Sequence, residues 1–194
     1  MSWETLDPRH GRLRMERVLQ HVSPGGRHLD VGTGNGDGTL LLRGHARCVG
    51  LEYGPKSAAI AATKGCTVVQ GDVRSAPFAS MSFDSITCLD VLEHVPRPQE
   101  ALAEMARLLV PGGCLVLQTP NRELLKERVL RLVRALGYPQ KQPYDLPLGL
   151  ADLRRLVGSS GLALIEERWM PCWDDRAWVR PFSRSRLFLC AKTR

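Results

Sequence analysis

A strand-like segment runs directly into a glycine-rich turn near the start of the chain. From residue 28 it reads His-Leu-Asp-Val-Gly-Thr-Gly-Asn-Gly-Asp-Gly-Thr. Glycine at such a turn lets a ligand lie against bare backbone and permits a positive φ. The dinucleotide spacing Gly-x-Gly-x-x-Gly fails from Gly32, because its last position is Asp37. Asp30 and Asp37 also disfavour a pyrophosphate, so the turn favours a cationic ligand, such as one bearing a sulfonium and an ammonium group.

Three more carboxylates stand at the ends of predicted strands. Glu52 closes the second strand, about twenty residues after the turn, where α/β folds place a carboxylate on ribose hydroxyls. Asp72 follows the third strand and can accept from an adenine amino group, while Val73 can pack on the ring face. Asp90 follows the fourth strand. Because α/β sheets bind ligands at the carboxyl ends of their strands, we expect these residues to share one site.

Short apolar strands alternate with helical stretches, which is typical of a parallel sheet covered by helices on both faces. The predicted strands span residues 27–31, 48–51, 67–70, 83–89, 114–119, 162–169 and 186–191. The predicted helices span residues 11–22, 39–44, 55–64, 98–109, 122–136 and 150–160. Between the last two strands there is no room for a full crossover helix, so we expect them to pair antiparallel.

Taken in order, these motifs resemble those of the class I methyltransferase family, in particular its small-molecule, methyltransferase type 11-like members. The pattern Asp-x-Leu-x-His-x stands at residues 90–95, and Leu-Val-Pro-Gly-Gly precedes the fifth strand at residues 109–113. The resemblance covers about residues 27–121. It implies an α/β fold with a Rossmann-like, doubly wound sheet in the order 3-2-1-4-5-7-6, with strand 7 antiparallel. It also implies S-adenosyl-L-methionine as cofactor and S-adenosyl-L-homocysteine as product.

The same resemblance assigns expected roles to individual residues. The methionine end of the cofactor is matched by Asp30, Gly32, Gly34 and Gly36, the ribose by Glu52, and the adenine by Asp72 and Val73. We also expect Thr33, Tyr53 and Leu89 in the cofactor site, Leu89 through its backbone or its apolar side chain. The histidine and cysteine spacing predicts no metal site.

The sequence gives a less specific signal for the catalytic residues than for the cofactor site. His94 either packs or caps locally, or it deprotonates an incoming hydroxyl or amine, because histidine titrates near neutrality. Asp90 either shapes the pocket or acts as the base. Methyl transfer from a sulfonium is an in-line displacement that depends mainly on alignment and exclusion of water, so a base matters only for a protonated, weakly acidic nucleophile.

The acceptor is predicted from what the sequence lacks and from its charge. The Asn/Asp-Pro-Pro-aromatic motif of amino-group nucleic-acid methyltransferases is missing after strand four, and Cys172 lies far from the position of a base-carbon nucleophile. A small-molecule or lipid-like acceptor is therefore favoured over RNA or protein. The net charge of +7 concentrates in residues 121–141 and 168–194, which suggests an anionic acceptor, a membrane surface or nucleic acid, or serves solubility alone.

The substrate side is expected to comprise the first helix, residues 120–150 and the connection 169–183. Residues 122–136 form a basic amphipathic helix, which is either a lid or a peripheral membrane contact. Met170, Trp173 and Trp178 either overhang the active face or pack under a loop.

The length of 194 residues predicts a single domain over 1–194. Within it we distinguish an N-terminal helix or lid (1–26), the cofactor-binding core (27–120), variable substrate-side helices (121–160) and a terminal hairpin (161–194). Six scattered cysteines, an N-terminus unlike a signal peptide and the lack of a long apolar stretch predict a cytoplasmic protein. The rival functions are a nicotinamide oxidoreductase, an enzyme of altered sulfonium chemistry, and a basic RNA-binding or regulatory module without turnover.

Overall fold

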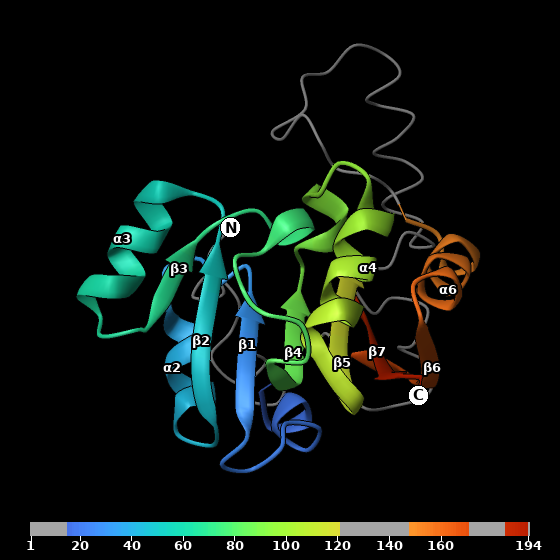
Figure 1. Ribbon diagram of the computed structural model, residues 1–194, viewed down its shortest axis with the longest axis horizontal. Helices are drawn as coiled ribbons and strands as arrows, with labels where there is room; N and C mark the ends of the chain where they lie inside the picture. Colours follow the sequence, from blue (N-terminus) through green and yellow to red (C-terminus); the bar gives the residue numbers. More distant parts are fainter. Residues whose placement is uncertain (1–14, 121–147, 171–184, 194) are drawn as a thin grey trace.

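A twisted sheet runs through the centre of the computed structural model, which describes residues 15–120, 148–170 and 185–193 (Figure 1). Seven strands in these segments take the order β3-β2-β1-β4-β5-β7-β6. They are β1 (Arg27–Val31), β2 (Arg47–Glu52), β3 (Val68–Gln70), β4 (Phe83–Leu89), β5 (Leu109–Pro120), β6 (Leu162–Met170) and β7 (Ser185–Lys192). β1 to β5 pair in parallel, whereas β7 is antiparallel to both of its neighbours. The predicted strand order and the antiparallel final pair are confirmed.

Helices cover both faces, as a parallel sheet requires. The larger helices are α2 (Asp37–Arg43), α3 (Pro55–Thr63), α4 (Pro98–Leu108) and α6 (Leu150–Ser159), with short 3-10 turns η2 (Val73–Ser75) and η3 (Leu92–His94). The main core cluster joins α4 and α6 to the sheet, and Leu102 and Met105 bury the apolar stripe of α4 there. A second cluster joins residues 15–19 and α2 to the other face, through Val18 and Leu42.

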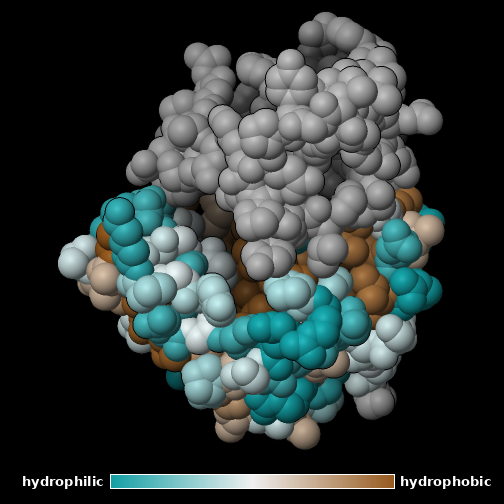
Figure 2. Space-filling view, turned by 90° about the horizontal axis from the view of Figure 1, so that it is seen from above, coloured by the Kyte–Doolittle hydropathy of each residue, from teal (hydrophilic) through white to brown (hydrophobic). Residues whose placement is uncertain are grey.

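The register of the sheet aligns the carboxyl ends of its central strands. Val31 of β1 pairs with Leu51 of β2 and with Cys88 of β4. Glu52 pairs with Gln70 one strand further out. The arrowheads of β1, β2 and β4 consequently point to one edge of the sheet (Figure 1). Figure 2 views the molecule from above, and apolar residues reach the described surface there beside a hydrophilic rim.

Some predicted boundaries are wrong. α2 begins at Asp37 rather than residue 39, because Gly36, with φ at 91°, caps it. β5 begins at Leu109 rather than residue 114, because Leu109 already pairs with Phe83 before the register shifts. Of the first predicted helix only the part from residue 15 is described, and it is helical over residues 15–19. The predicted helix 122–136 lies outside the described residues, as do Trp173, Trp178 and the side chain of Met170.

In the described part of the chain, none of the helices combines the length and the apolar character needed to cross a membrane.

Candidate cofactor-binding site

The glycine turn after β1 has three left-handed residues with different surroundings. Gly32, Gly34 and Gly36 have φ values of 75°, 55° and 91°. A Cβ on Gly32 would lie 2.1 Å from Cγ2 of Val91, and one on Gly36 would lie 2.6 Å from Sγ of Cys66. A Cβ on Gly34 would meet nothing within 4 Å. The two outer glycines therefore allow tight packing, and the middle one leaves bare backbone beside open space, as a ligand needs.

Thr33 braces the turn from inside. Its hydroxyl donates to the backbone oxygen of Asp30 at 3.1 Å, and the side chain is buried. A Cβ on Gly50 would lie 2.1 Å from the Thr33 hydroxyl oxygen, so glycine in β2 makes room for it. The structure thus places Thr33 in the support of the loop, against β2, rather than on its open side.

Asp30 lies at the carboxyl end of β1 and is held by two hydroxyls. Thr39 of α2 donates to its Oδ2 at 2.6 Å, and Thr87 of β4 donates to its Oδ1 at 2.7 Å. Only 6% of Asp30 is exposed. The second acid of the turn behaves differently from the sequence expectation, because Oδ1 of Asp37 accepts from Nζ of Lys64 at 2.6 Å. The charge of Asp37 is therefore compensated by Lys64 of the segment that follows α3.

Glu52 joins the end of β2 to the open side of the turn. Its Oε2 accepts from the backbone N–H of Gly34 at 2.8 Å, and its Oε1 accepts from that of Gly54 at 2.8 Å. Each carboxylate oxygen keeps a further lone pair. The half-buried carboxylate thus stands beside Gly34, where it suits a pair of neighbouring hydroxyl donors. The ring of Tyr53 follows it and is 75% exposed, which leaves an aromatic face open at this edge.

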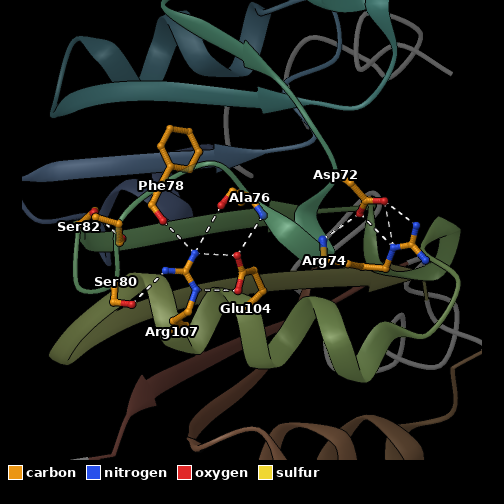
Figure 3. Close-up of polar contacts among 9 residues, drawn as sticks. Asp72, Arg74, Ala76, Phe78, Ser80, Ser82, Glu104 and Arg107 are labelled. Atoms are coloured by element: carbon orange, nitrogen blue, oxygen red, sulfur yellow. Dashed lines mark hydrogen bonds and ion pairs between the residues drawn. The ribbon is translucent and has the colours of Figure 1, made fainter.

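Asp72 begins the 3-10 turn η2 and pairs with a residue of the same turn (Figure 3). Oδ1 of Asp72 accepts from the backbone N–H of Arg74 at 2.9 Å, and Oδ2 accepts from Nη2 of Arg74 at 2.5 Å. These hydrogen bonds from Arg74 hold the pKa of Asp72 below its usual value. Val73 points into the main core cluster and is buried, so most of its side chain contributes to packing.

Asp90 occupies a strained backbone position at the end of β4. Its φ is 56°, which is uncommon for a residue other than glycine. The backbone N–H of Asp90 donates to the carbonyl of Gln118 on β5 at 2.9 Å. Nε2 of Gln118 lies 3.1 and 3.2 Å from the two carboxylate oxygens of Asp90. This arrangement fixes the Asp90 carboxylate at the carboxyl edge of the sheet.

Leu89 and His94 flank Asp90 without sharing its hydrogen bonds to Gln118. Leu89 is half-buried and packs against the second core cluster, on the face of residues 15–19 and α2. His94 ends η3, its backbone N–H donates to the carbonyl of Val91 at 2.9 Å, and its side chain is exposed. The structure therefore places both candidate catalytic residues at the edge of the sheet, Asp90 fixed and His94 at the surface.

Comparison with known proteins identifies the family. A family model described as a methyltransferase domain matches residues 29–117. The ubiquinone biosynthesis O-methyltransferase of Chromobacterium violaceum is 32% identical over 170 residues, which cover 78% of this chain and 71% of that protein. This chain belongs to the class I S-adenosylmethionine-dependent methyltransferase family.

Two further similarities describe the breadth of that family. The probable tRNA methyltransferase 9B of Bos taurus is 34% identical over 125 residues, which cover 60% of this chain and 27% of that protein. This chain accordingly spans about a quarter of that relative's length. Among solved structures, the magnesium protoporphyrin IX methyltransferase of Synechocystis PCC 6803 with bound SAH has a TM-score of 0.72 at 20% identity, covering 95% of this chain and 84% of that one. That likeness supports the methyltransferase fold.

An arginine on α4, which sequence reasoning missed, fastens the loop that follows η2 (Figure 3). Nη2 of Arg107 donates to the carbonyl of Phe78 at 2.9 Å, and its Nε donates to Oε2 of Glu104 at 2.8 Å. Oε1 of Glu104 in turn accepts from the backbone N–H of Ala76 at 3.0 Å. The hydrogen bonds from Arg107 hold the pKa of Glu104 below its usual value. The i, i+3 spacing predicts the ion pair, but it gives no sign of the loop carbonyl.

Sequence reasoning also missed Gln118 and His28. Gln118 is 2% exposed and touches Asp90 from the neighbouring strand. His28 is fully buried in β1, with Nδ1 2.8 Å from the Ser85 hydroxyl and Nε2 3.0 Å from the Thr87 hydroxyl. The partners of both residues are far away in the sequence.

Proposed function

We propose that this chain transfers a methyl group from S-adenosylmethionine to an O, N or C nucleophile of a small-molecule or lipid-like acceptor. The observation that carries the proposal is the contact between Glu52 and Gly34. It brings a carboxylate that can bind ribose hydroxyls to the one of the three left-handed glycines of the turn that has open space beside it. Family membership supports the same cofactor.

The residues present suit each part of this cofactor. The carboxylate of Glu52 accepts from the two ribose hydroxyls, and the exposed ring of Tyr53 offers a face to the adenine. Asp72, whose pKa Arg74 lowers further, is ionised at neutral pH and accepts from the adenine amino group. Asp30 and the backbone of the turn face the methionine end. When bound, S-adenosylmethionine supplies a methyl group on a positively charged sulfur, and the negative charge of Asp30 favours the positively charged end.

Asp90 is the better candidate for contact with the acceptor. Gln118 holds its carboxylate in a fixed orientation from β5, so Asp90 can align a donor group of the acceptor without first having to be ordered. His94 is exposed and is proposed as the base when the acceptor nucleophile carries a proton.

The acceptor class is supported by the extent of similarity. The match covers 71% of the ubiquinone biosynthesis relative but only 27% of the tRNA methyltransferase relative. Because the first comparison extends over most of the relative's own length, it favours a small or lipid-like acceptor over RNA. RNA- or protein-directed methylation, and a basic binding module without turnover, are the alternatives that the experiments below separate.

Two sequence predictions belong to this proposal. The basic helix 122–136 is proposed to contact a membrane on which a lipid-like acceptor is carried, and flotation with anionic liposomes tests it. Protein that stays entirely in the soluble fraction would contradict that contact. The cytoplasmic location is supported by the five described cysteines, all of which are free thiols.

The cofactor is tested by calorimetric titration with S-adenosylmethionine, S-adenosylhomocysteine and NAD. We expect micromolar binding of the two sulfur ligands and none of NAD. The Glu52→Ala variant should lose this binding, and Gly34→Ala should weaken it because its new methyl occupies the open space beside the turn. Glu166→Ala on β6, at the opposite edge of the sheet, is the matched carboxylate control and should bind normally. A well-folded wild-type protein that binds neither sulfur ligand would overturn the proposal.

The acceptor is tested with S-adenosylmethionine carrying a radioactive methyl group. Label transferred to a lipid or small-molecule extract, and not to tRNA or protein, is the expected result. Transfer to tRNA alone would establish the RNA-directed alternative. Cofactor binding with no transfer to any fraction, combined with salt-sensitive RNA binding, would favour the non-catalytic module.

A further inference from the structure

Four polar side chains face one another across β1 and β4 in the middle of the sheet. His28 pairs with Ser85 and Asp30 pairs with Thr87 in the register of these strands. Side chains alternate between the two faces of a strand, so these four share one face. The residues that alternate with them join the main core on the opposite face: Leu29, Val31, Ile86 and Cys88. Strands of a covered parallel sheet are usually apolar on both faces. This polar row is therefore an exception that requires a reason.

The hydrogen bonds of the row have one consistent direction. The Thr87 hydroxyl has a single proton, which it donates to the carboxylate of Asp30 at 2.7 Å, because an ionised carboxylate only accepts. The contact of 3.0 Å between Thr87 and Nε2 of His28 must then be donated by the ring. His28 thus carries its proton on Nε2, and its Nδ1 accepts from the Ser85 hydroxyl at 2.8 Å.

His28 takes part in this chain as a neutral ring. Burial, assisted by the nearby His45, lowers the pKa of His28 to about 4. At neutral pH the ring therefore acts as a directional donor and acceptor. The row holds Asp30 through the neutral hydroxyl of Thr87, so the row itself adds no positive charge at that carboxylate.

We propose that His28 and Thr87 are positioning residues, which fix the Asp30 carboxylate for the ammonium group at the methionine end of the cofactor. This inference rests on the proposed function. Thr87 holds Oδ1 from β4 and Thr39 holds Oδ2 from α2, so the carboxylate cannot rotate without breaking one of these bonds. A group fixed in this way loses little freedom when it binds its ligand, which strengthens binding.

The proposal is tested with two ligands that differ at the methionine end. S-Adenosylhomocysteine carries the ammonium group, whereas 5′-methylthioadenosine has the same adenosine and sulfur without the amino acid. We expect Thr87→Val to weaken S-adenosylhomocysteine about tenfold and 5′-methylthioadenosine less than twofold, because only the former presents an ammonium to Asp30. Thr87→Ser keeps the hydroxyl and should bind both ligands as the wild type does.

The ratio of the two affinities decides the outcome. A Thr87→Val variant that is folded and keeps the wild-type ratio would overturn the positioning role, while leaving the proposed cofactor intact. Wild-type protein that binds neither ligand would instead overturn the proposed function itself. His28→Gln retains an amide donor toward Thr87, so its ratio of the two affinities should stay closer to the wild-type value than that of His28→Leu. Equal changes of the ratio in the two variants would contradict the hydrogen bonds that connect His28, through Thr87, to Asp30.

A measurement on the unmodified protein covers the case in which the variants do not fold. Nitrogen-15 NMR of the histidine rings reports which nitrogen carries the proton. We expect His28 at pH 7 to be protonated on Nε2 and unprotonated on Nδ1. A proton on Nδ1, or on both nitrogens, would overturn the inferred direction of the hydrogen bonds and with it the proposal.

Discussion

The two ends of the candidate site hold their carboxylates by opposite means. Asp30, at the proposed methionine end, is buried and accepts from the neutral hydroxyls of Thr39 and Thr87. Asp72, at the proposed adenine end, is half-buried and accepts from the cation of Arg74. The first group is fixed by side chains from a separate strand and helix, and the second by a neighbour two residues along the chain.

This difference has consequences for stability and for salt. A buried hydrogen-bonded network is costly to break, because the groups left behind lack partners and water. A partly exposed ion pair contributes little to stability and is screened by salt. We therefore infer that the methionine end is a rigid part of the core. The adenine end is instead a surface loop, and Arg107 and Glu104 fasten it to α4.

The largest effect is expected from a methyl group added beside the glycine turn. In Gly36→Ala the new Cβ would meet Sγ of Cys66 at 2.6 Å and Cα of Ala61 at 3.1 Å, at a φ of 91°. We expect a loss of about 3–4 kcal/mol in the free energy of unfolding, measured with urea. Gly71→Ala, at the adenine end, has contacts of 3.1 Å or more and should lose about 1 kcal/mol or less. Equal losses would contradict the contrast between a rigid core around the glycine turn and a surface loop after η2.

The next effect is the contribution of His28 to the pH dependence of stability. Its pKa is about 4 in the fold and about 6.5 when unfolded, so below pH 6.5 the unfolded chain binds the extra proton. Stability should therefore fall by about 2–3 kcal/mol as the pH drops from 7 to 4.5, a window above the lowered pKa of Asp72. His28→Gln should lack this share of the decline when both proteins are unfolded by urea. An unchanged slope in His28→Gln would contradict the depressed pKa.

The sequence predicted the fold well, because the relevant signals are local. Alternating apolar strands and helices predicted a parallel sheet covered on both faces, and the short link before the last strand predicted its antiparallel pairing. The strand order followed from the family resemblance, and the structure has that order. Glycine spacing located the turn, although its left-handed conformations at Gly32, Gly34 and Gly36 leave only the middle one open. Boundaries failed where a cap or a register shift decides them, as at Gly36 and Leu109.

The support of the site was harder to predict, because it depends on contacts between distant residues. Thr87 reaches Asp30 across 57 positions of sequence, and Gln118 reaches Asp90 across 28. One signal was available for the first of these: polar residues recur at every second position in both β1 and β4. No comparable sequence pattern predicts the contact of Gln118 with Asp90, which follows only from the pairing of β4 with β5.

A smaller effect is expected when the loop that follows η2 loses its hydrogen bonds to Arg107. Arg107→Ala removes the hydrogen bonds to the Phe78 carbonyl and to Glu104, and we expect a loss of about 1–2 kcal/mol in the free energy of unfolding. The KM for S-adenosylmethionine should rise several-fold with a smaller change in kcat, since the loop carries Asp72. Arg154→Ala on α6 removes only an exposed pair with Glu167 and should change neither quantity. An unaltered KM in Arg107→Ala would contradict a contribution of this loop to cofactor binding.

The smallest effect is expected from the ion pair at the adenine end. Arg74→Ala removes the cation that holds the pKa of Asp72 low, but the carboxylate stays ionised at pH 7, because its ordinary pKa is far lower. What is lost is orientation, so the Kd for S-adenosylhomocysteine should rise about two- to threefold. In the wild type, raising NaCl from about 0.05 to 0.5 M should reproduce much of that rise, because salt screens the partly exposed pair. The variant itself should respond little to salt. The hydroxyls of Thr39 and Thr87 that hold Asp30 are neutral donors. A salt response as large in Arg74→Ala as in the wild type would therefore show that salt acts on an interaction other than the Arg74–Asp72 pair, and it would contradict the contrast between the two carboxylates.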